Sequence, residues 1–186
     1  MKSTAAAAGN GQGAQQTLQG WQDREAELTA RAAPVGLAQP DQIAGKSGLQ
    51  MFEAMLAGQL PRAPITTTLQ FWLVEATFGH AEFQGKPAFE HYNPLGGVHG
   101  GWMATLLDSA VGCAVHTLLP PGKAYTTLEL KVNFVKGLSD RVPLVRAIGD
   151  VIHSGGRVAT AEGRLVGPDG TLYAHATTTC LIFDAR

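Results

Sequence analysis

A long apolar run over residues 102–119 constrains the fold of this chain more than any other feature. The run contains no proline, and Pro120-Pro121-Gly122 closes it. Its length favours an α-helix, because β-strands usually span only about four to eight residues. Apolar side chains occupy nearly every face of this helix, which is typical of a helix enclosed by other structure. The rest of the chain is therefore expected to wrap around it.

Six further segments have the β-branched and aromatic content that is typical of strands. Two precede the run and four follow it, and they span residues 66–78, 79–90, 124–135, 142–153, 157–166 and 171–183. Apolar and polar residues alternate from Leu128 to Phe134, which predicts one buried and one wetter face. A long central helix wrapped by a bent antiparallel sheet is an α+β fold.

The N-terminal part of the chain differs in composition from the rest. Residues 1–20 are rich in alanine, glycine and glutamine, so we expect them to be disordered or poorly ordered. A short polar helix is predicted over residues 21–31. Apolar residues at roughly helical spacing predict another helix over residues 41–60. We therefore predict a partly disordered low-complexity leader over residues 1–40 and a single domain over residues 41–186.

The low charge of the chain limits its partners. Charged residues make up 16% of the sequence, the net charge is −1, and no run of Lys or Arg occurs. These values argue against nucleic acid or an anionic membrane as the main partner, although a few local cations suffice for a phosphate-bearing ligand. So few charges also suggest that another copy of the chain covers part of the surface.

The two cysteines, Cys113 and Cys180, each lie in an apolar stretch. Neither has a CxxC or histidine-spaced partner, which argues against a zinc site. Two buried free thiols are typical of a cytoplasmic protein, although a disulfide stays open. The residues after Met1 hold no apolar core long enough for a signal peptide, and no stretch reaches membrane-spanning length. We therefore expect a cytoplasmic protein without a metal site.

Gly100 and Gly101 lie where a loop becomes the long helix. The first amides of a helix lack intrahelical acceptors and carry the positive end of the helix dipole. Glycines let a substrate approach this backbone closely, so a carbonyl placed there is polarised and an oxyanion is stabilised. Asp108 lies among apolar residues of the same helix, where a carboxylate needs a partner or a function. The alternative to a catalytic function is a structural one, in which Asp108 accepts a hydrogen bond from Thr105, Ser109 or a nearby backbone group.

The spacing along the helix separates the glycines at its start from Asp108. Gly101 and Asp108 are seven residues apart, or roughly 10 Å along a helix. One carbonyl carbon cannot contact both, so if they act together they come from different subunits. Two antiparallel copies of the helix would bring Asp108 of one copy beside Gly100 of the other. The sequence therefore predicts an isologous homodimer.

The stretch Asn93-x5-His99-Gly100-Gly101-x6-Asp108 resembles the signature of PaaI-type hotdog thioesterases. This branch includes the Arthrobacter-type 4-hydroxybenzoyl-CoA thioesterases. The similarity continues through residues 125–134 and the Gly155-Gly156-Arg157 triplet, and it covers roughly residues 45–183. The resemblance implies a hotdog fold, hydrolysis of an acyl-CoA thioester, no cofactor beyond the CoA of the substrate, and a homodimer or dimer of dimers.

The resemblance also implies a role for each motif residue. The Gly100 amide would bind the thioester oxygen, and Asp108 of the facing subunit would act as nucleophile or general base. Asn93 would orient the carbonyl or the attacking water. His99 would hold the loop and assist polarisation. Thr127 matches a position that places water or the aspartate.

A second group of residues is implied to bind CoA. Lys136 and Arg157 would meet its phosphates, and the Gly155 and Gly156 amides would add donors. Gly137 occupies a place where relatives often carry proline. The whole group is Gly101, Phe134, Val135, Lys136, Gly137, Ser154, Gly155, Gly156 and Arg157.

Several of these residues also have plain structural interpretations. His99 could bond the loop backbone, and Asn93 before Pro94 is a natural turn residue. Lys136 and Arg157 could be solvated surface charges. Strand alternation places Thr127 on the face of Glu129 and Lys131, away from the buried face, so it serves the site only at a strand edge or dimer cleft.

Two other functions remain open. A hotdog dehydratase or hydratase would use His99 as a base beside Asp108, and a non-catalytic acyl-CoA-binding module would need no carboxylate at position 108. His153 and His175 have no assigned role. The acyl group and the tetramer arrangement are not predicted.

Overall fold

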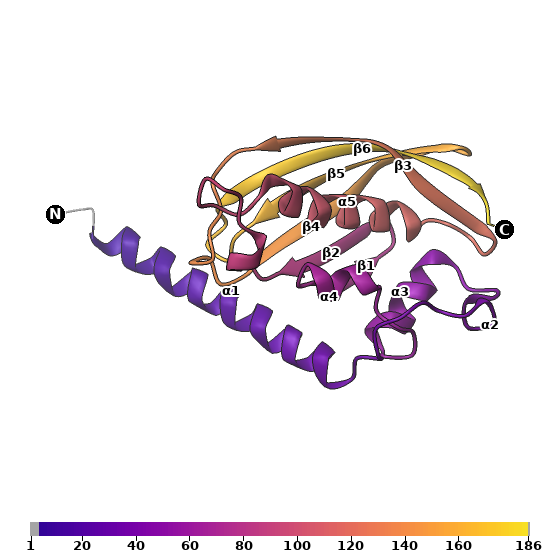
Figure 1. Cartoon of the computed structure of the whole chain (residues 1–186), viewed down its shortest axis with the longest axis horizontal. Coiled ribbons are helices and arrows are strands. Elements are labelled where there is room, and N and C mark those ends of the chain that lie inside the picture. Colours follow the sequence, from indigo (N-terminus) through magenta and orange to yellow (C-terminus); the bar gives the residue numbers. More distant parts are fainter. Residues whose placement is uncertain (1–3, 186) are drawn as a thin grey trace.

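The computed structural model describes residues 4–185 of the chain, with side chains from residue 11 onward. Figure 1 shows a helix lying against a bent sheet, with the long N-terminal helix and several short helices beneath it. In chain order the elements are α1 (Thr4–Ala30), α2 (Pro40–Ile43), α3 (Gly48–Leu56), α4 (Pro64–Thr68), β1 (Phe71–Thr77), β2 (His80–Gly85), the 3₁₀ turn η1 (Phe89–His91), α5 (Gly100–His116), β3 (Lys123–Phe134), β4 (Val145–Ser154), β5 (Val158–Val166) and β6 (Leu172–Asp184).

The six strands form one antiparallel sheet in the order β1-β2-β4-β5-β6-β3. The strands β1 and β3 are therefore its edges. Helix α5 packs on the sheet through Leu106, Leu107 and Ala110, which are fully buried. At Gly149 in β4, an added Cβ would lie 2.4 Å from the Ala110 carbonyl oxygen, so a glycine is needed where the helix meets the sheet. The predicted α+β architecture is confirmed.

Helix α5 was expected over residues 102–119 and spans Gly100–His116. It begins two residues earlier because the His99 side chain caps it by accepting a hydrogen bond from the Gly101 amide. Both glycines of the motif therefore belong to the first helical turn. None of the helices in the described part of the chain is both long and apolar enough to cross a membrane.

The N-terminal region is more helical than expected. Helix α1 runs from Thr4 to Ala30, so helical backbone covers most of residues 1–20, which were expected to be disordered or poorly ordered, and continues into the short helix predicted over residues 21–31. Alanine and glutamine favour helical backbone, and no proline interrupts this stretch. Most described side chains between residues 11 and 20 are exposed. This part of α1 therefore lacks the tertiary contacts that normally stabilise a helix.

Two other predicted elements have different bounds. The helix expected over residues 41–60 consists of α2 and α3, and Ser47 begins α3 by accepting a hydrogen bond from the Gln50 amide. The first strand was expected from residue 66, but residues 64–68 form α4, which Pro64 starts at its first position. Gln70 then turns the chain with a φ of 52° before β1.

The C-terminal half of α1 is attached to the sheet by side chains. Arg24 donates to the carbonyl oxygen of Val74 in β1 from Nε (3.1 Å) and Nη2 (3.0 Å). Gln84 of β2 donates to Glu25 at 3.1 Å. Helix α3 covers the end of α5, where the rings of Phe52 and His116 meet edge to face at 5.4 Å. Helices α1 and α3 thus form a layer over one flank of the domain.

Candidate active site

The loop before α5 is held by its own polar side chains. Asn93 Oδ1 accepts hydrogen bonds from the amides of Leu95 (2.8 Å) and Gly97 (3.4 Å). His99 Nδ1 accepts from the Gly101 amide at 2.8 Å, and the His99 amide donates to the His91 carbonyl oxygen at 2.8 Å. Asn93 and His99 therefore both shape the loop that leads into the helix, as their structural interpretation predicted.

Gly100 lies at the first position of α5, beside an aromatic ring. The Gly101 and Trp102 amides donate to His99, whereas the Gly100 amide has no such partner among the described residues. A Cβ at Gly100 would lie 2.9 Å from the Phe134 ring. The predicted oxyanion donor and the end of β3 are thus brought together.

Asp108 has a partner on the edge strand. Thr127 donates from Oγ1 to Asp108 Oδ1 at 3.0 Å. The hydroxyls of Thr105 and Ser109 instead donate to backbone carbonyls of their own helix. Neither hydroxyl therefore donates to Asp108, although both were candidate structural partners from the sequence. Asp108 is only half-buried.

The face predicted for Thr127 was wrong because the strand is irregular. The pairing of β3 with β6 shifts between Thr127 and Glu129, so a β-bulge interrupts the alternation there. Leu128 is consequently 58% exposed, whereas Leu130 packs on the core. The bulge turns Thr127 toward α5 without placing Glu129 there.

Gly100 and Asp108 do not meet within one chain. They are eight residues apart on α5, or about 12 Å along its axis. Each lies beside a different part of β3, because Phe134 at its end contacts Gly100 and Thr127, seven residues earlier, contacts Asp108. Within one subunit, the predicted oxyanion donor and the predicted carboxylate are therefore two separate half-sites.

The residues predicted to bind CoA also form two groups. Val135 and Lys136 follow the end of β3, and both amides donate to the Tyr173 carbonyl oxygen. The turn over residues 154–157 lies at the opposite end of the sheet, because Val158 pairs with Leu181 near the start of β3. The Gly155 amide donates to the Val158 carbonyl oxygen within this turn. It is therefore engaged in the turn and less available to a phosphate.

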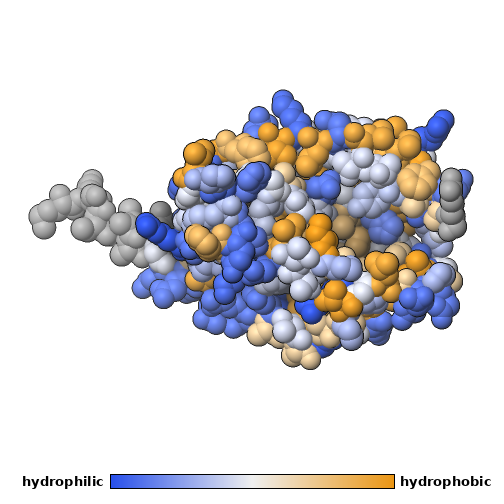
Figure 2. All heavy atoms as spheres, in the orientation of Figure 1, coloured by the Kyte–Doolittle hydropathy of each residue, from blue (hydrophilic) through white to orange (hydrophobic). Residues whose placement is uncertain are grey.

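The edge strand β3 exposes apolar side chains. Leu128 and Phe134 of β3 are 58% and 53% exposed, and Val135, directly after the strand, is 56% exposed. Figure 2 shows hydrophobic atoms gathered along the margin of the molecule where β3 and β6 run. An open strand edge with such side chains is a surface on which another sheet can pair.

Three titratable groups near the site have pKa values shifted by their surroundings, and two of them, Tyr125 and His91, were not singled out from the sequence. Burial raises the pKa of the Cys113 thiol to about 12 and also raises the pKa of Tyr125 well above its usual value. Burial lowers the pKa of His91, whose ring stacks on Trp102 at 4.9 Å. His91 stands two residues before Asn93, and this proximity was the only signal for it. The described residues contain no group of three side chains placed to hold a metal ion.

Two comparisons bear on the site region. A family model described as the thioesterase superfamily matches residues 95–174, which include Gly100, Asp108 and Thr127. A protein of Halobacterium salinarum, named as a candidate esterase, is 38% identical over 84 residues. That match covers 44% of this chain and 54% of the relative, so the chain spans about half the length of this relative.

Solved structures extend the similarity over more of the chain. One protein from the thioesterase superfamily is 31% identical with a TM-score of 0.55, and the match covers 63% of this chain and 88% of that one. A phenylacetic acid degradation-related protein from Ralstonia eutropha JMP134, named as a candidate thioesterase, is 29% identical with a TM-score of 0.64. That match covers 70% of this chain and 98% of the other. The bent sheet around α5 therefore defines a hotdog-fold protein. The chain belongs to the thioesterase superfamily, in its PaaI-type branch.

Proposed function

We propose that this protein hydrolyses an acyl-CoA thioester to the free acid and CoA, at a site shared by two subunits of a homodimer. One observation carries the proposal. The strand β3 joins the two half-sites, since Thr127 near its start bonds Asp108 and Phe134 at its end contacts Gly100.

Pairing of two β3 edges would complete the site. Antiparallel strands centred between residues 130 and 131 place Thr127 of one strand opposite Phe134 of the other. Asp108 of the partner subunit then lies beside Gly100, and the two-fold symmetry creates the same site twice. The exposed apolar side chains of β3 would be covered in the same step.

The chemistry follows from this arrangement. The thioester oxygen accepts from the Gly100 amide at the positive end of α5, which stabilises the tetrahedral oxyanion. Asp108 acts as general base by taking a proton from water, whose oxygen then bonds the carbonyl carbon. Collapse of the oxyanion breaks the carbon–sulfur bond, and the CoA thiolate leaves and takes up a proton. Attack by the carboxylate itself, through an anhydride that water then opens, is the other route.

The two groups of CoA-binding residues would meet across the same interface. Antiparallel pairing of β3 brings the 154–157 turn of the partner subunit toward the end of β3 that carries Lys136. Lys136 and Arg157 of the partner subunit would then bind the phosphates from two sides. A dimer of dimers and a cytoplasmic location remain predictions.

The hydratase alternative is less well supported. It needs a histidine base, but His99 Nδ1 already accepts a hydrogen bond from the Gly101 amide as the helix cap. A module that only binds acyl-CoA would not need a carboxylate held by Thr127.

Substitution of Asp108 tests the proposal. Asp108→Asn keeps the shape and the Thr127 contact but removes the base, so release of CoA thiol from a panel of alkyl- and aryl-CoA thioesters should fall at least about 100-fold. Binding of the same thioesters should persist. Ser109→Ala is the matched control, because the Ser109 hydroxyl donates to the Thr105 carbonyl oxygen of its own helix. Hydrolysis by Asp108→Asn at nearly the native rate would overturn the proposal.

A further inference from the structure

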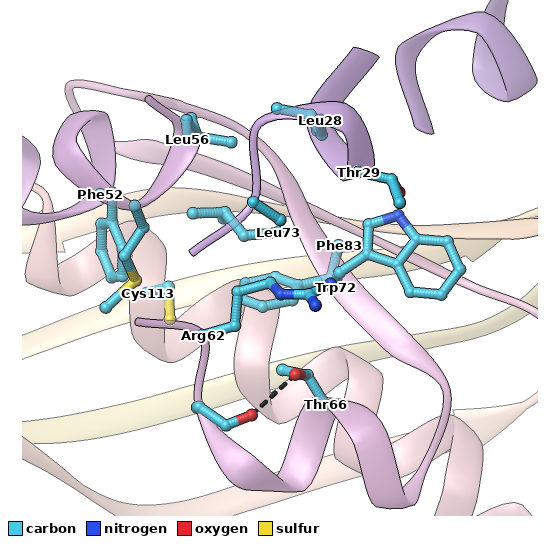
Figure 3. Close-up of a pocket in the computed structure, with 13 residues that line it drawn as sticks. Leu28, Thr29, Phe52, Leu56, Arg62, Thr66, Trp72, Leu73, Phe83 and Cys113 are labelled. Carbon is cyan, nitrogen blue, oxygen red and sulfur yellow. Dashed lines mark hydrogen bonds between the residues drawn. The ribbon is translucent and has the colours of Figure 1, made fainter. Parts of the chain in front are cut away.

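An apolar cavity of about 140 Å³ lies between α5, the β1–β2 hairpin and the N-terminal helices. Figure 3 shows side chains from these separate segments converging on it. Its main contributors are Leu28, Phe52, Leu56, Arg62, Trp72 and Cys113.

The N-terminal region supplies one wall of this cavity. Leu28 comes from α1, Phe52 and Leu56 from α3, and Arg62 from the segment before α4. All four precede residues 95–174, where the family model matches. Cys113 of α5 belongs to the opposite wall and lies inside that segment. The cavity therefore lies between the central helix of the fold and an N-terminal region that the family model does not match.

The cavity lies close to the proposed reaction centre. Cys113 is five residues from Asp108 on α5, or about 7.5 Å along the helix. The Cys113 thiol lies beside the Tyr125 hydroxyl, and Tyr125 and Thr127 share one face of β3 about 6.6 Å apart. Cys113 therefore connects the cavity wall to Tyr125, which lies two residues from the Thr127 that bonds Asp108.

The size of the cavity limits what it can hold. Apolar cavities of about 150 Å³ accept a benzene molecule. A cavity of about 140 Å³ therefore fits one aromatic ring or a chain of about six carbons. A long fatty acyl chain does not fit.

Two hydrogen-bond donors interrupt the apolar lining. Arg62 Nε and Trp72 Nε1 are buried, and neither has a hydrogen-bond partner among the described residues. Figure 3 shows the Arg62 side chain pointing toward Trp72 across the cavity. Within the described residues, no carboxylate lies within 4.0 Å of the Arg62 guanidinium. Buried donors without acceptors cost free energy, and an oxygen acceptor on a ligand would remove that cost.

We propose that this cavity binds the acyl group of the thioester substrate, and that Arg62 and Trp72 bind an oxygen acceptor on that group. The inference rests on the proposed function. The substrate class is a CoA thioester whose acyl part is about as large as one ring or six carbons and ends in an oxygen, most favourably a carboxylate.

A pair of substrates with equal chain length tests the polar end. Adipoyl-CoA and hexanoyl-CoA differ by a terminal carboxylate, and the native enzyme should have the higher kcat/KM for adipoyl-CoA. Arg62→Met should lower the ratio of the two kcat/KM values at least tenfold. Arg164→Met, an exposed arginine on β5, is the matched control and should leave the ratio unchanged. An unchanged ratio in Arg62→Met would refute the role of Arg62.

Two variants of opposite effect test the cavity itself. Ala32→Phe fills it from the N-terminal side and should lower kcat/KM for hexanoyl-CoA at least tenfold relative to acetyl-CoA. Leu28→Ala enlarges it and should shift the preference toward octanoyl-CoA. The cavity proposal fails if neither folded variant changes the dependence on chain length.

Binding measurements separate this inference from the proposed function. In the Asp108→Asn background, calorimetry with adipoyl-CoA should give a dissociation constant that Ala32→Phe raises at least tenfold. If the native chain hydrolyses no thioester, the proposed function fails, whereas the calorimetry still tests the cavity. If hydrolysis depends on Asp108 but the cavity variants change neither binding nor chain preference, only the cavity inference fails.

Discussion

The Thr127 hydroxyl donates a 3.0 Å hydrogen bond to Asp108, which links the edge strand β3 to the central helix α5. The contact orients the one carboxylate that the proposed mechanism uses. It also fixes where on β3 that carboxylate lies, seven residues before the Phe134 ring that contacts Gly100. Much of the proposed chemistry depends on this pair.

Removal of the Thr127 hydroxyl should lower turnover more than substrate binding. Thr127→Val keeps the branched shape of the side chain but cannot donate to Asp108. A hydrogen bond to a charged group is worth about 1.5–3 kcal/mol, so kcat should fall by about 10- to 100-fold while KM changes little. Thr127→Ser restores the donor and should recover most of the rate. Steady-state kinetics of the native protein and the two variants give kcat and KM for each. Equal kcat values for Thr127→Val and the native protein would exclude this positioning role.

Two inactive variants should restore activity when they are mixed. Gly100→Ala places a Cβ 2.9 Å from the Phe134 ring and obstructs the carbonyl site, while Asp108→Asn removes the base. After joint refolding, half of the dimers are mixed, and one of the two sites in each mixed dimer has both native residues. The mixture should therefore show about a quarter of the native activity. A mixture as inactive as its parents would mean that both residues act within one chain.

His116 should make stability depend on pH. Burial lowers its pKa, and its Nδ1 is buried without a hydrogen-bond partner among the described residues. Because the folded pKa is below the unfolded value of about 6.5, this contribution to stability is complete above pH 6.5 and is lost as pH falls through the folded pKa. The loss is at most about 1.4 kcal/mol per pH unit.

His116→Phe isolates this contribution. It keeps the edge-to-face ring contact with Phe52 and removes the titrating group. Urea unfolding at pH 7.5 and pH 5.0 should show a smaller loss of the free energy of unfolding in the variant than in the native protein. Equal losses would show that His116 does not titrate in this range.

Cys113 should be inert in the folded protein. With a pKa of about 12, about one thiol in 10⁴ is ionised at pH 8, compared with about a quarter of free cysteine thiols. Alkylation of Cys113 by iodoacetamide should therefore be about a thousand-fold slower than that of free cysteine, and unfolding in urea should remove the difference. Peptide mass spectrometry identifies the modified residue, and rapid labelling of the native protein would contradict the prediction.

The central helix and the half-sites could be predicted from local patterns. The apolar run over residues 102–119 and the closing prolines identify α5 without any long-range information. The glycines at its start and Asp108 eight residues into it follow from counting, as does the conclusion that one chain cannot bring them together. These features depend on spacing along a single helix, where sequence distance converts directly into spatial distance.

The face of Thr127 could not be predicted in this way. Alternation along β3 holds only while the strand stays in register with β6, and the bulge after Thr127 reverses it. Nothing in residues 124–135 alone marks the bulge. The extent of α1 was missed for another reason, because its composition was interpreted as a leader although alanine and glutamine favour helix.

The sequence by itself determined the central helix, its glycine entry and the separation of Gly100 from Asp108. Only the tertiary structure decided that Thr127 holds Asp108, and that residues 28, 52 and 62 enclose a cavity against Cys113. These contacts join residues that are far apart in the sequence. Thr127 and Asp108 are 19 residues apart, and Leu28 and Cys113 are 85 residues apart. They depend on how helices and strands pack together in space, and no local pattern of hydrophobic residues specifies that arrangement.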